Sequence, residues 1–228
     1  MTESTIVESS LDALLDARIS CRAYEDRQVP RDVINEILRL AQKTPSWCNT
    51  QPWQVAITEG EGTQRFREGL GAYVMSHAQE SDFEFPREYQ GVYKARRFEC
   101  AMALYSSVGI AEGDRAASGA QTMKNFELFG APHVAIITTD EALGTYGAVD
   151  CGLYVNTFLL AAQSLGVATI PQAALAGSSA FIHEFFGIDD TRKVVCAISF
   201  GYPDTDHPVN GFRTTREAVE NVTQWVAN

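Results

Sequence analysis

The sequence lacks the short motifs that identify several enzyme classes. Neither GxGxxG nor GxxxxGK(S/T) occurs, which argues against a Rossmann or P-loop nucleotide site. HExxH, GxSxG and CxxC are also missing, and no cysteine–histidine cluster has the spacing of a zinc site. The four histidines stand apart from one another along the chain. The sequence therefore indicates no metal site, serine-hydrolase triad or redox dithiol.

Basic residues and long apolar runs are scarce as well. Against 29 aspartates and glutamates there are 18 lysines and arginines, a formal net charge of −11. Such a chain is a poor candidate for nucleic-acid binding, because neutralising phosphates requires a basic face. The most apolar stretch, residues 147–168, is interrupted by Asp150, Asn156 and Gln163, and the N-terminus is acidic where a signal peptide would be basic. The sequence predicts no nucleic-acid partner, membrane span or signal peptide.

The five cysteines are an odd number at scattered positions, which indicates reduced thiols and a cytoplasmic protein. Cys48 follows a predicted helix end, where a thiol could be activated as a nucleophile. The alternative is a small residue that lines a pocket, and the lack of a nameable histidine partner favours it. His133 opens an apolar run and is interpreted as a structural residue.

The 228 residues, 45% of them hydrophobic, are enough for one packed domain, and no repeat or linker divides them. We expect a single domain over 1–228 with a C-terminal arm from about 203–228. Apolar residues spaced three and four apart between Val33 and Ala41 predict a helix that Pro45 closes. Gly166 is a plausible cap for a long apolar helix.

The remaining expected elements alternate between helix and strand. Residues 81–100 mix aromatic and charged side chains and give no clear assignment. This order predicts an α+β fold in which helices cover a central mixed sheet. The expected helices lie near residues 11–15 and over 63–80, 114–129, 146–165 and 178–186, and the expected strands over 54–58, 133–139, 167–170 and 194–200.

Arginines cluster near both ends of the chain. Arg18, Ser20 and Arg22 fall within five residues, and Arg213 and Arg216 flank two threonines. Guanidinium groups beside hydroxyl donors are what a phosphate monoester requires. The alternative is ordinary surface arginine.

Between these clusters lies a loop of short polar residues, PSWCNTQPW at 45–53. Its carboxamides, Asn49 and Gln51, could bond a planar heterocycle that carries alternating donors and acceptors. The alternative is a loop whose amides bond their own backbone.

Taken in order, these segments resemble the FMN-dependent nitroreductase family. The resemblance rests on ARISCRAY at 17–24, PSWCNTQPW at 45–53, GVATIPQAA at 166–174, and GYPD followed by NGFRTTR at 201–216. It spans most of the chain, and residues 62–130 match only loosely. Within the family, the chain looks most like enzymes that act on nitroaromatics such as nitrobenzoate.

The resemblance implies an interlocked homodimer with FMN at the subunit interface. Arg18, Ser20 and Arg213 or Arg216 would hold the phosphate, and Arg22 would lie near the pyrimidine end of the flavin. A backbone N–H of Ala173 or Ala174 would face flavin N5, while the loop would contact the flavin from the partner subunit. The implied cofactor-binding residues are Arg18, Ile19, Ser20, Arg22, Pro45, Ser46, Trp47, Asn49, Gln51, Pro171, Gln172, Ala173, Ala174, Arg213 and Arg216.

The implied activity is ping-pong hydride transfer from NADH or NADPH, through the flavin, to a small aromatic oxidant. No side chain needs to act as a catalytic acid, because the cofactor supplies the chemistry. The expected reaction reduces nitroaromatics to hydroxylamines. A reductase of quinones, activated alkenes or halogenated aromatics with the same fold, and a non-catalytic flavin-binding dimer, remain alternatives. The aromatic-rich segment around Phe83 to Tyr93 could form a substrate lid or serve as packing.

Overall fold

A computed structural model describes residues 3–227 of the chain. Its centre is a four-stranded sheet in the order β1-β2-β4-β3, and all neighbouring strands pair antiparallel. The sheet is thus antiparallel where a mixed sheet was expected, and Ser20 adds an isolated parallel bridge to Thr169 at the β3 edge. The strands are β1 (Gln54–Ile57), β2 (His133–Asp140), β3 (Ala168–Gln172) and β4 (Arg192–Gly201).

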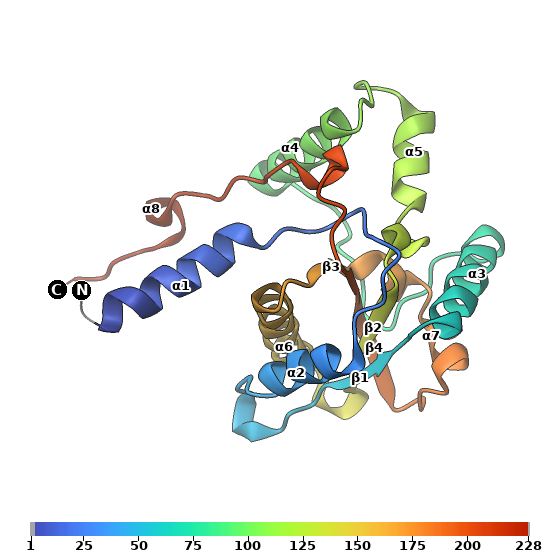
Figure 1. Ribbon diagram of the computed structural model, residues 1–228, viewed down its shortest axis with the longest axis horizontal. Coiled ribbons are helices and arrows are strands. Elements are labelled where there is room, and N and C mark those ends of the chain that lie inside the picture. The colour runs from blue at the N-terminus through green and yellow to red at the C-terminus, as the bar shows by residue number, and fades with distance from the viewer. Residues whose placement is uncertain (1–2, 228) are drawn as a thin grey trace.

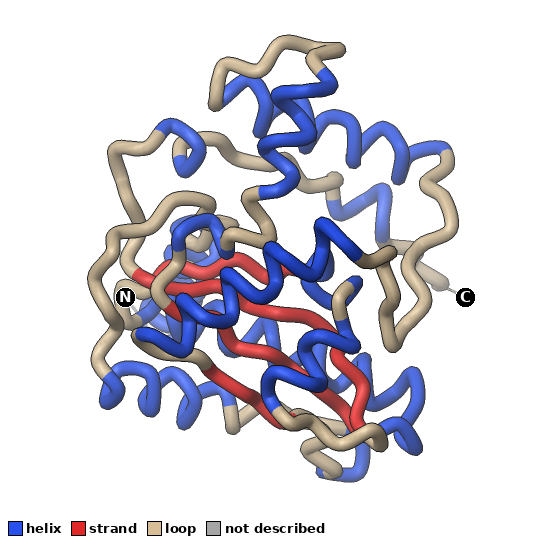
Figure 2. The backbone as a smooth tube through the Cα atoms, turned by 90° about the vertical axis from the view of Figure 1, so that its right-hand side faces the viewer, coloured by secondary structure: helices blue, strands red, loops and turns tan. Residues whose placement is uncertain are grey.

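Helices lie on both faces of this sheet (Figures 1 and 2). Within residues 3–227, no helix combines the length and hydropathy needed to cross a bilayer. The helices are α1 (Glu3–Ala17), α2 (Arg31–Ala41), α3 (Glu61–Ser76), α4 (Gly91–Ser107), α5 (Arg115–Met123), α6 (Gly144–Ser164), α7 (Ser179–Phe186) and α8 (Val219–Val222).

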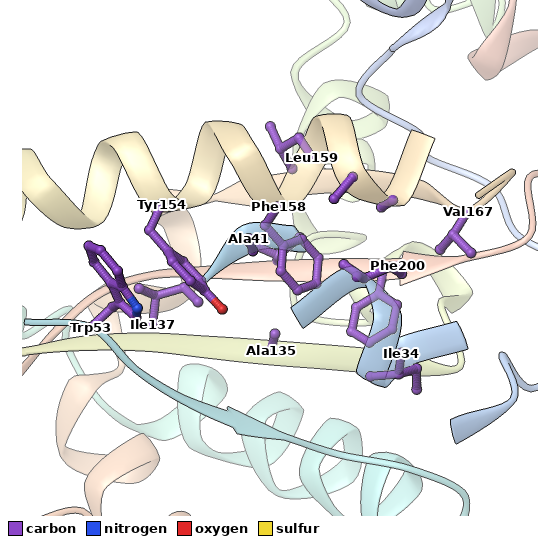
Figure 3. Packing of buried hydrophobic residues seen from close by; sticks show 14 of the residues in the cluster. Ile34, Ala41, Trp53, Ala135, Ile137, Tyr154, Phe158, Leu159, Val167 and Phe200 are labelled. Atoms are coloured by element: carbon purple, nitrogen blue, oxygen red, sulfur yellow. The ribbon is translucent and has the colours of Figure 1, made fainter. Parts of the chain in front are cut away.

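Two apolar cores follow from the alternation of side chains along the strands. In β2, Ala135 and Ile137 point to the core shared with α2 and α6, while Val134 and Ile136 point to the core shared with α3 and α7. Figure 3 shows the first core, in which the rings of Trp53 and Tyr154 stack at 4.9 Å. The continuous apolar run of β2 thus reflects burial on both faces.

Gly166 ends α6 as the sequence predicts. Its φ of +74° lies in the left-handed region that glycine adopts readily. The N–H of Gly166 donates to the Gln163 carbonyl, and the N–H of Val167 donates to the Ala162 carbonyl at 2.9 Å. This pair of bonds is a Schellman motif, and it turns the chain directly into β3.

Most expected elements are confirmed within a few residues, and two expectations change. The helix expected over 114–129 ends at Met123, because Leu128 and Phe129 are buried with positive φ in a separate turn. The unassigned stretch 81–100 contains the first half of α4. Within α4, every residue of which is described, no side chain is fully buried, so the helix carries no clear apolar stripe.

The two ends of the described chain project from the sheet on the same side of the molecule, to the left in Figure 1. α1 carries the exposed side chains of Leu11 and Leu15, and the tail beyond α8 carries Trp225, which is 90% exposed. Large apolar side chains on projecting segments are typical of surfaces that a partner covers.

His133, at the start of β2, is buried and bonded to backbone groups on both sides. Its Nε2 accepts the Val29 N–H at 3.0 Å, and its Nδ1 lies 3.0 Å from the Thr58 carbonyl. The neutral ring with its proton on Nδ1 satisfies both contacts. Burial is the main cause that lowers the pKa of His133 below its usual value of 6.5.

This lowered pKa predicts a loss of stability in mild acid. Below about pH 6.5 the unfolded chain binds a proton that the folded chain rejects, so stability falls as the pH drops toward the folded-state pKa. We expect the unfolding free energy from urea titration to drop between pH 7.5 and 5 by up to about 1.4 kcal/mol per pH unit from this group. His133→Gln should flatten that dependence. Equal pH profiles for the two proteins would contradict the assignment.

Candidate functional site

The arginine segment near the N-terminus is fixed between the sheet edge and the C-terminal segment. The N–H of Cys21 donates to the Thr169 carbonyl of β3 at 3.0 Å. Tyr24 forms a bridge with Pro203, and the N–H of Glu25 donates to the Tyr202 carbonyl at 2.9 Å. The chain is thus folded so that its two arginine clusters meet on one side of β3.

Arg18 and Arg216 lie close enough for their charges to interact. Burial, and after it the positive charge of Arg216, lowers the pKa of Arg18. Arg216 donates to the carbonyl and hydroxyl of Thr214 and to the carbonyl of Thr215, and Arg213 donates to the carbonyls of Asn210 and Phe212.

Within residues 3–227, none of Arg18, Arg22, Arg213 and Arg216 forms an ion pair with a carboxylate. This is unusual in a chain whose acidic residues outnumber its basic residues by 29 to 18. Gathered guanidinium groups without counter-charge are suited to bind an anion.

A cavity of about 770 Å³ lies beside these arginines, between α4 and the C-terminal arm. The arm is held to α4 by the Arg96–Glu217 ion pair at 2.5 Å and by a hydrogen bond from Thr215 to Glu99 at 2.9 Å. Sequence reasoning missed the α4 contribution, because residues 81–100 showed no periodic pattern. The lining residues are Arg96, Glu99, Cys100, Ala103, Arg213, Thr214, Thr215, Arg216, Glu217 and Val222.

Arg22 occupies a half-buried position near this cavity. Its Nη1 donates to the Ser20 carbonyl at 3.0 Å, and its guanidinium lies 5.4 Å from the centre of the Phe212 ring. Burial lowers the pKa of Arg22, and the neighbouring Cys100 thiol opposes the shift. The guanidinium remains a cation at neutral pH. Its hydrogen bond to the Ser20 carbonyl holds this charge in one place beside the cavity.

In the loop at 45–53, residues 45–51 are exposed or half-exposed, Pro52 and Trp53 are buried, and part of the backbone is strained. Cys48, Asn49 and Gln51 all have φ between +47° and +56°, a region that non-glycine residues seldom adopt. Hydrogen bonds within the loop maintain it: the Gln51 N–H donates to Ser46 Oγ at 2.9 Å, and Gln51 Nε2 donates to Asn49 Oδ1 at 3.1 Å. The carboxamides thus bond each other, and Asn49 and Ser46 stay exposed or half-exposed.

Asp150 of α6 attaches this loop to the body of the protein. Its buried carboxylate accepts the Trp47 N–H, with the two oxygens at 3.1 and 3.2 Å. The exposed Trp47 ring packs edge-on against Tyr146 of the same helix, with ring centres 4.5 Å apart. Sequence reasoning missed Asp150, because the contact joins residues far apart in the chain.

Residues 171–174 leave β3 for a short 3₁₀ turn. Pro171 and Ala173 are exposed, and Ala174 is half-buried. Gln172 is buried, and its amide is used by the fold: Nε2 donates to the Asn125 carbonyl at 3.0 Å, and Oε1 accepts from Ser199 Oγ. Any role of Gln172 toward a ligand therefore rests on its backbone. Ile19, between Arg18 and Ser20, is half-buried.

Comparison with known proteins identifies the family. The model of the nitroreductase family matches residues 15–202. The chain belongs to the nitroreductase family.

Relatives of this nitroreductase cover almost its whole length. It is 31% identical over 221 residues to a 4-nitrobenzoate reductase of Pseudomonas putida, covering 97% of each chain. It is 33% identical over 218 residues to nitroreductase NfnB of Mycolicibacterium smegmatis, covering 94% of this chain and 92% of the relative. Family membership predicted from the motifs is therefore confirmed.

Solved structures support the same assignment. The structure of FMN-dependent NfnB from Mycobacterium smegmatis in complex with NADPH superposes with a TM-score of 0.91 and 30% identity, covering 97% of this nitroreductase and 100% of that chain. FMN- and NADPH-dependent NfnB of a Sphigopyxis strain gives the same TM-score at 29% identity, covering 95% and 99%. The predicted fold class is confirmed.

Among the described residues, no group of three or more histidine, cysteine, aspartate or glutamate side chains is placed to hold a metal ion. The donor set beside β3 consists of guanidinium, hydroxyl and backbone N–H groups. Such donors match a phosphorylated organic ligand.

The hydrogen bond from the Trp47 N–H to Asp150 should protect the backbone amides of the loop from exchange. Asp150→Ala removes the acceptor, and because a hydrogen bond to a charged group contributes about 1.5–3 kcal/mol, amide exchange at residues 47–51 should speed up on the order of 10–100-fold. Asp150→Asn keeps an acceptor oxygen and should retain most of the protection. Hydrogen exchange measured by mass spectrometry checks this. Unchanged protection in the alanine variant would show that other contacts hold the loop.

Proposed function

We propose that this chain is an FMN-dependent NAD(P)H nitroreductase that reduces nitroaromatic compounds. The observation that carries the proposal is the gathering of Arg18, Arg22, Arg213 and Arg216 without a carboxylate partner within residues 3–227. The reductases of 4-nitrobenzoate among the relatives, and the NfnB structures described as FMN- and NADPH-dependent, support the cofactor and the substrate class.

The donor set fits the phosphate end of FMN. A phosphate monoester carries close to two negative charges, and it is held best by arginines together with hydroxyl groups. Arg18, Ser20, Arg213, Thr214 and Arg216 offer this combination. The cavity beside them has a volume of about 770 Å³, within the range of small-molecule sites.

The chain's own residues would position the ligand and stabilise charge. The half-buried Arg22 guanidinium, fixed on the Ser20 carbonyl, would stabilise negative charge at the pyrimidine end of the ring. Ala173 and Ala174 begin a 3₁₀ turn, and the first amides of such a turn lack acceptors within it, so a backbone N–H is available to face N5. The chemistry that bound FMN supplies is two-electron transfer from NAD(P)H to the oxidant.

A second copy of the chain would complete the site. In Figure 1 the loop at 45–53 lies below α2, whereas the C-terminal segment runs beside α4, so one chain keeps these two segments apart. Tyr146, Val149 and Leu153, three and four residues apart on α6, form an exposed apolar stripe next to this loop. Such a stripe is typical of an interface between subunits, and the projecting α1 and C-terminal tail would embrace the partner.

The cytoplasmic location also belongs to the proposal. All five cysteines lie within the described residues and are free thiols. Four of them are buried or half-buried, and Cys48 is exposed. Free thiols suit a reducing compartment.

Anaerobic spectroscopy tests the proposed function. The purified protein, or the protein reconstituted with FMN, should show flavin absorbance that NADH or NADPH bleaches in a saturable reaction. Addition of 4-nitrobenzoate should then restore the absorbance, and quinones and halogenated aromatics should do so more slowly. Stopped-flow absorbance provides the rates.

Three results would contradict the proposal in different ways. A colourless protein that does not take up FMN would exclude the cofactor. Slow, unsaturable reduction by both nicotinamides would indicate a non-catalytic flavin-binding dimer. Faster reoxidation by quinones than by any nitroarene would assign a different oxidant to the same site.

A further inference from the structure

We propose that Asn210 is a positioning residue that sets the spacing between the two arginine segments of the site described above. This inference rests on the proposed FMN site. Asn210 begins the NGFRTTR motif and is not among the cofactor-binding residues that the resemblance implies. Its side chain fixes the backbone of Arg22 and Ala23 beside the C-terminal segment that carries Arg213.

Asn210 makes four hydrogen bonds, two of which reach the N-terminal arginine segment. Its Oδ1 accepts the backbone N–H of Arg22 at 2.8 Å, and its Nδ2 donates to the carbonyls of Ala23 and Asp204 at 2.9 and 2.8 Å. The main-chain carbonyl of Asn210 accepts from Nη1 of Arg213 at 3.0 Å. One residue thus contacts the backbone of one arginine and the guanidinium of the other.

The chemistry of these contacts requires a carboxamide. The three side-chain partners are one N–H and two carbonyls, so the amide needs an acceptor on one side and two donors on the other. Asparagine supplies both in a short side chain, and Asn210 is buried with 7% of its surface exposed. Aspartate would lack the donors, and serine could serve only part of the set.

The backbone around Asn210 has other links that do not depend on its side chain. The Asp204 N–H donates to the Ala23 carbonyl at 3.1 Å, and Tyr24 bridges Pro203. These bonds keep the two segments side by side when the amide is removed. Loss of the amide should therefore alter the spacing of the arginines and leave the sheet folded.

The expected consequence concerns the phosphate. In the proposed site the phosphate lies between Arg18 and Ser20 of one segment and Arg213 and Arg216 of the other, so an error in the spacing of the two segments weakens binding of FMN. Riboflavin has the same ring system and lacks the phosphate. It would meet Arg22, whose guanidinium is held separately on the Ser20 carbonyl, so its affinity should change little.

The experiment compares the dissociation constants of FMN and riboflavin, measured by fluorescence quenching on the apoprotein of the full chain. Wild-type protein should bind FMN more tightly than riboflavin. Asn210→Ala should reduce this preference about 10-fold or more, corresponding to the loss of one or two hydrogen bonds in a charged site, while riboflavin affinity changes less than about 3-fold. Asn210→Ser should give an intermediate preference.

Asn35→Ala provides the matched control, because Asn35 is an exposed asparagine on α2. It should leave both dissociation constants unchanged. Circular dichroism and thermal melting verify that the variants fold. If the alanine variant does not fold, the comparison is made with Asn210→Ser, which removes fewer hydrogen bonds.

Two results would overturn the inference. An unchanged FMN preference in the alanine or serine variant would show that Asn210 does not position the arginines. An equal loss of FMN and riboflavin affinity would show a purely structural role. Failure of the wild-type protein to bind FMN is a separate result, which would overturn the proposed function and this inference with it.

Discussion

Repulsion between the guanidinium groups of Arg18 and Arg216, within a set of four arginines that have no carboxylate partner among the described residues, is the constraint on which the organisation of this nitroreductase depends. Like charges a few ångströms apart oppose each other by on the order of 1–4 kcal/mol, depending on the local dielectric. The chain nevertheless brings Arg18 close to Arg216 and fixes Arg22 and Arg213 through Asn210. The β3 bridge of Ser20 and the pairing of Tyr24 with Pro203 hold these segments in place. An anion between the arginines turns this repulsion into attraction, which explains why the fold maintains it.

The rest of the polar interior serves the fold. The ring nitrogens of His133 bond to backbone groups of Val29 and Thr58, and the side-chain amide of Gln172 bonds to Asn125 and Ser199. Neither side chain is available for acid–base chemistry. This agrees with a site in which a bound cofactor supplies the reactive atoms and the protein supplies position and charge. The strained backbone of Cys48, Asn49 and Gln51 is maintained by hydrogen bonds within the loop and by Asp150.

Local patterns predicted those parts of the structure that depend on local physics. The three-and-four spacing gave α2, the β-branched runs gave β2 and β4, and Gly166 marked the end of α6. α4 was not predicted, because it buries no side chain fully and carries no periodic stripe within its described residues. The arginines were visible as clusters. The contacts of Asn210 and Asp150 were not predicted, since their partners Arg22 and Trp47 lie 188 and 103 residues away. No local pattern encodes such contacts.

The most direct test of this account is a crystal structure of the protein with FMN. The account predicts electron density for the phosphate between Arg18, Arg213 and Arg216, with Arg22 beside the ring. It also predicts that the loop at 45–53 of a second copy contacts the same flavin. A phosphate bound away from these arginines, or a flavin enclosed by a single chain, would contradict it.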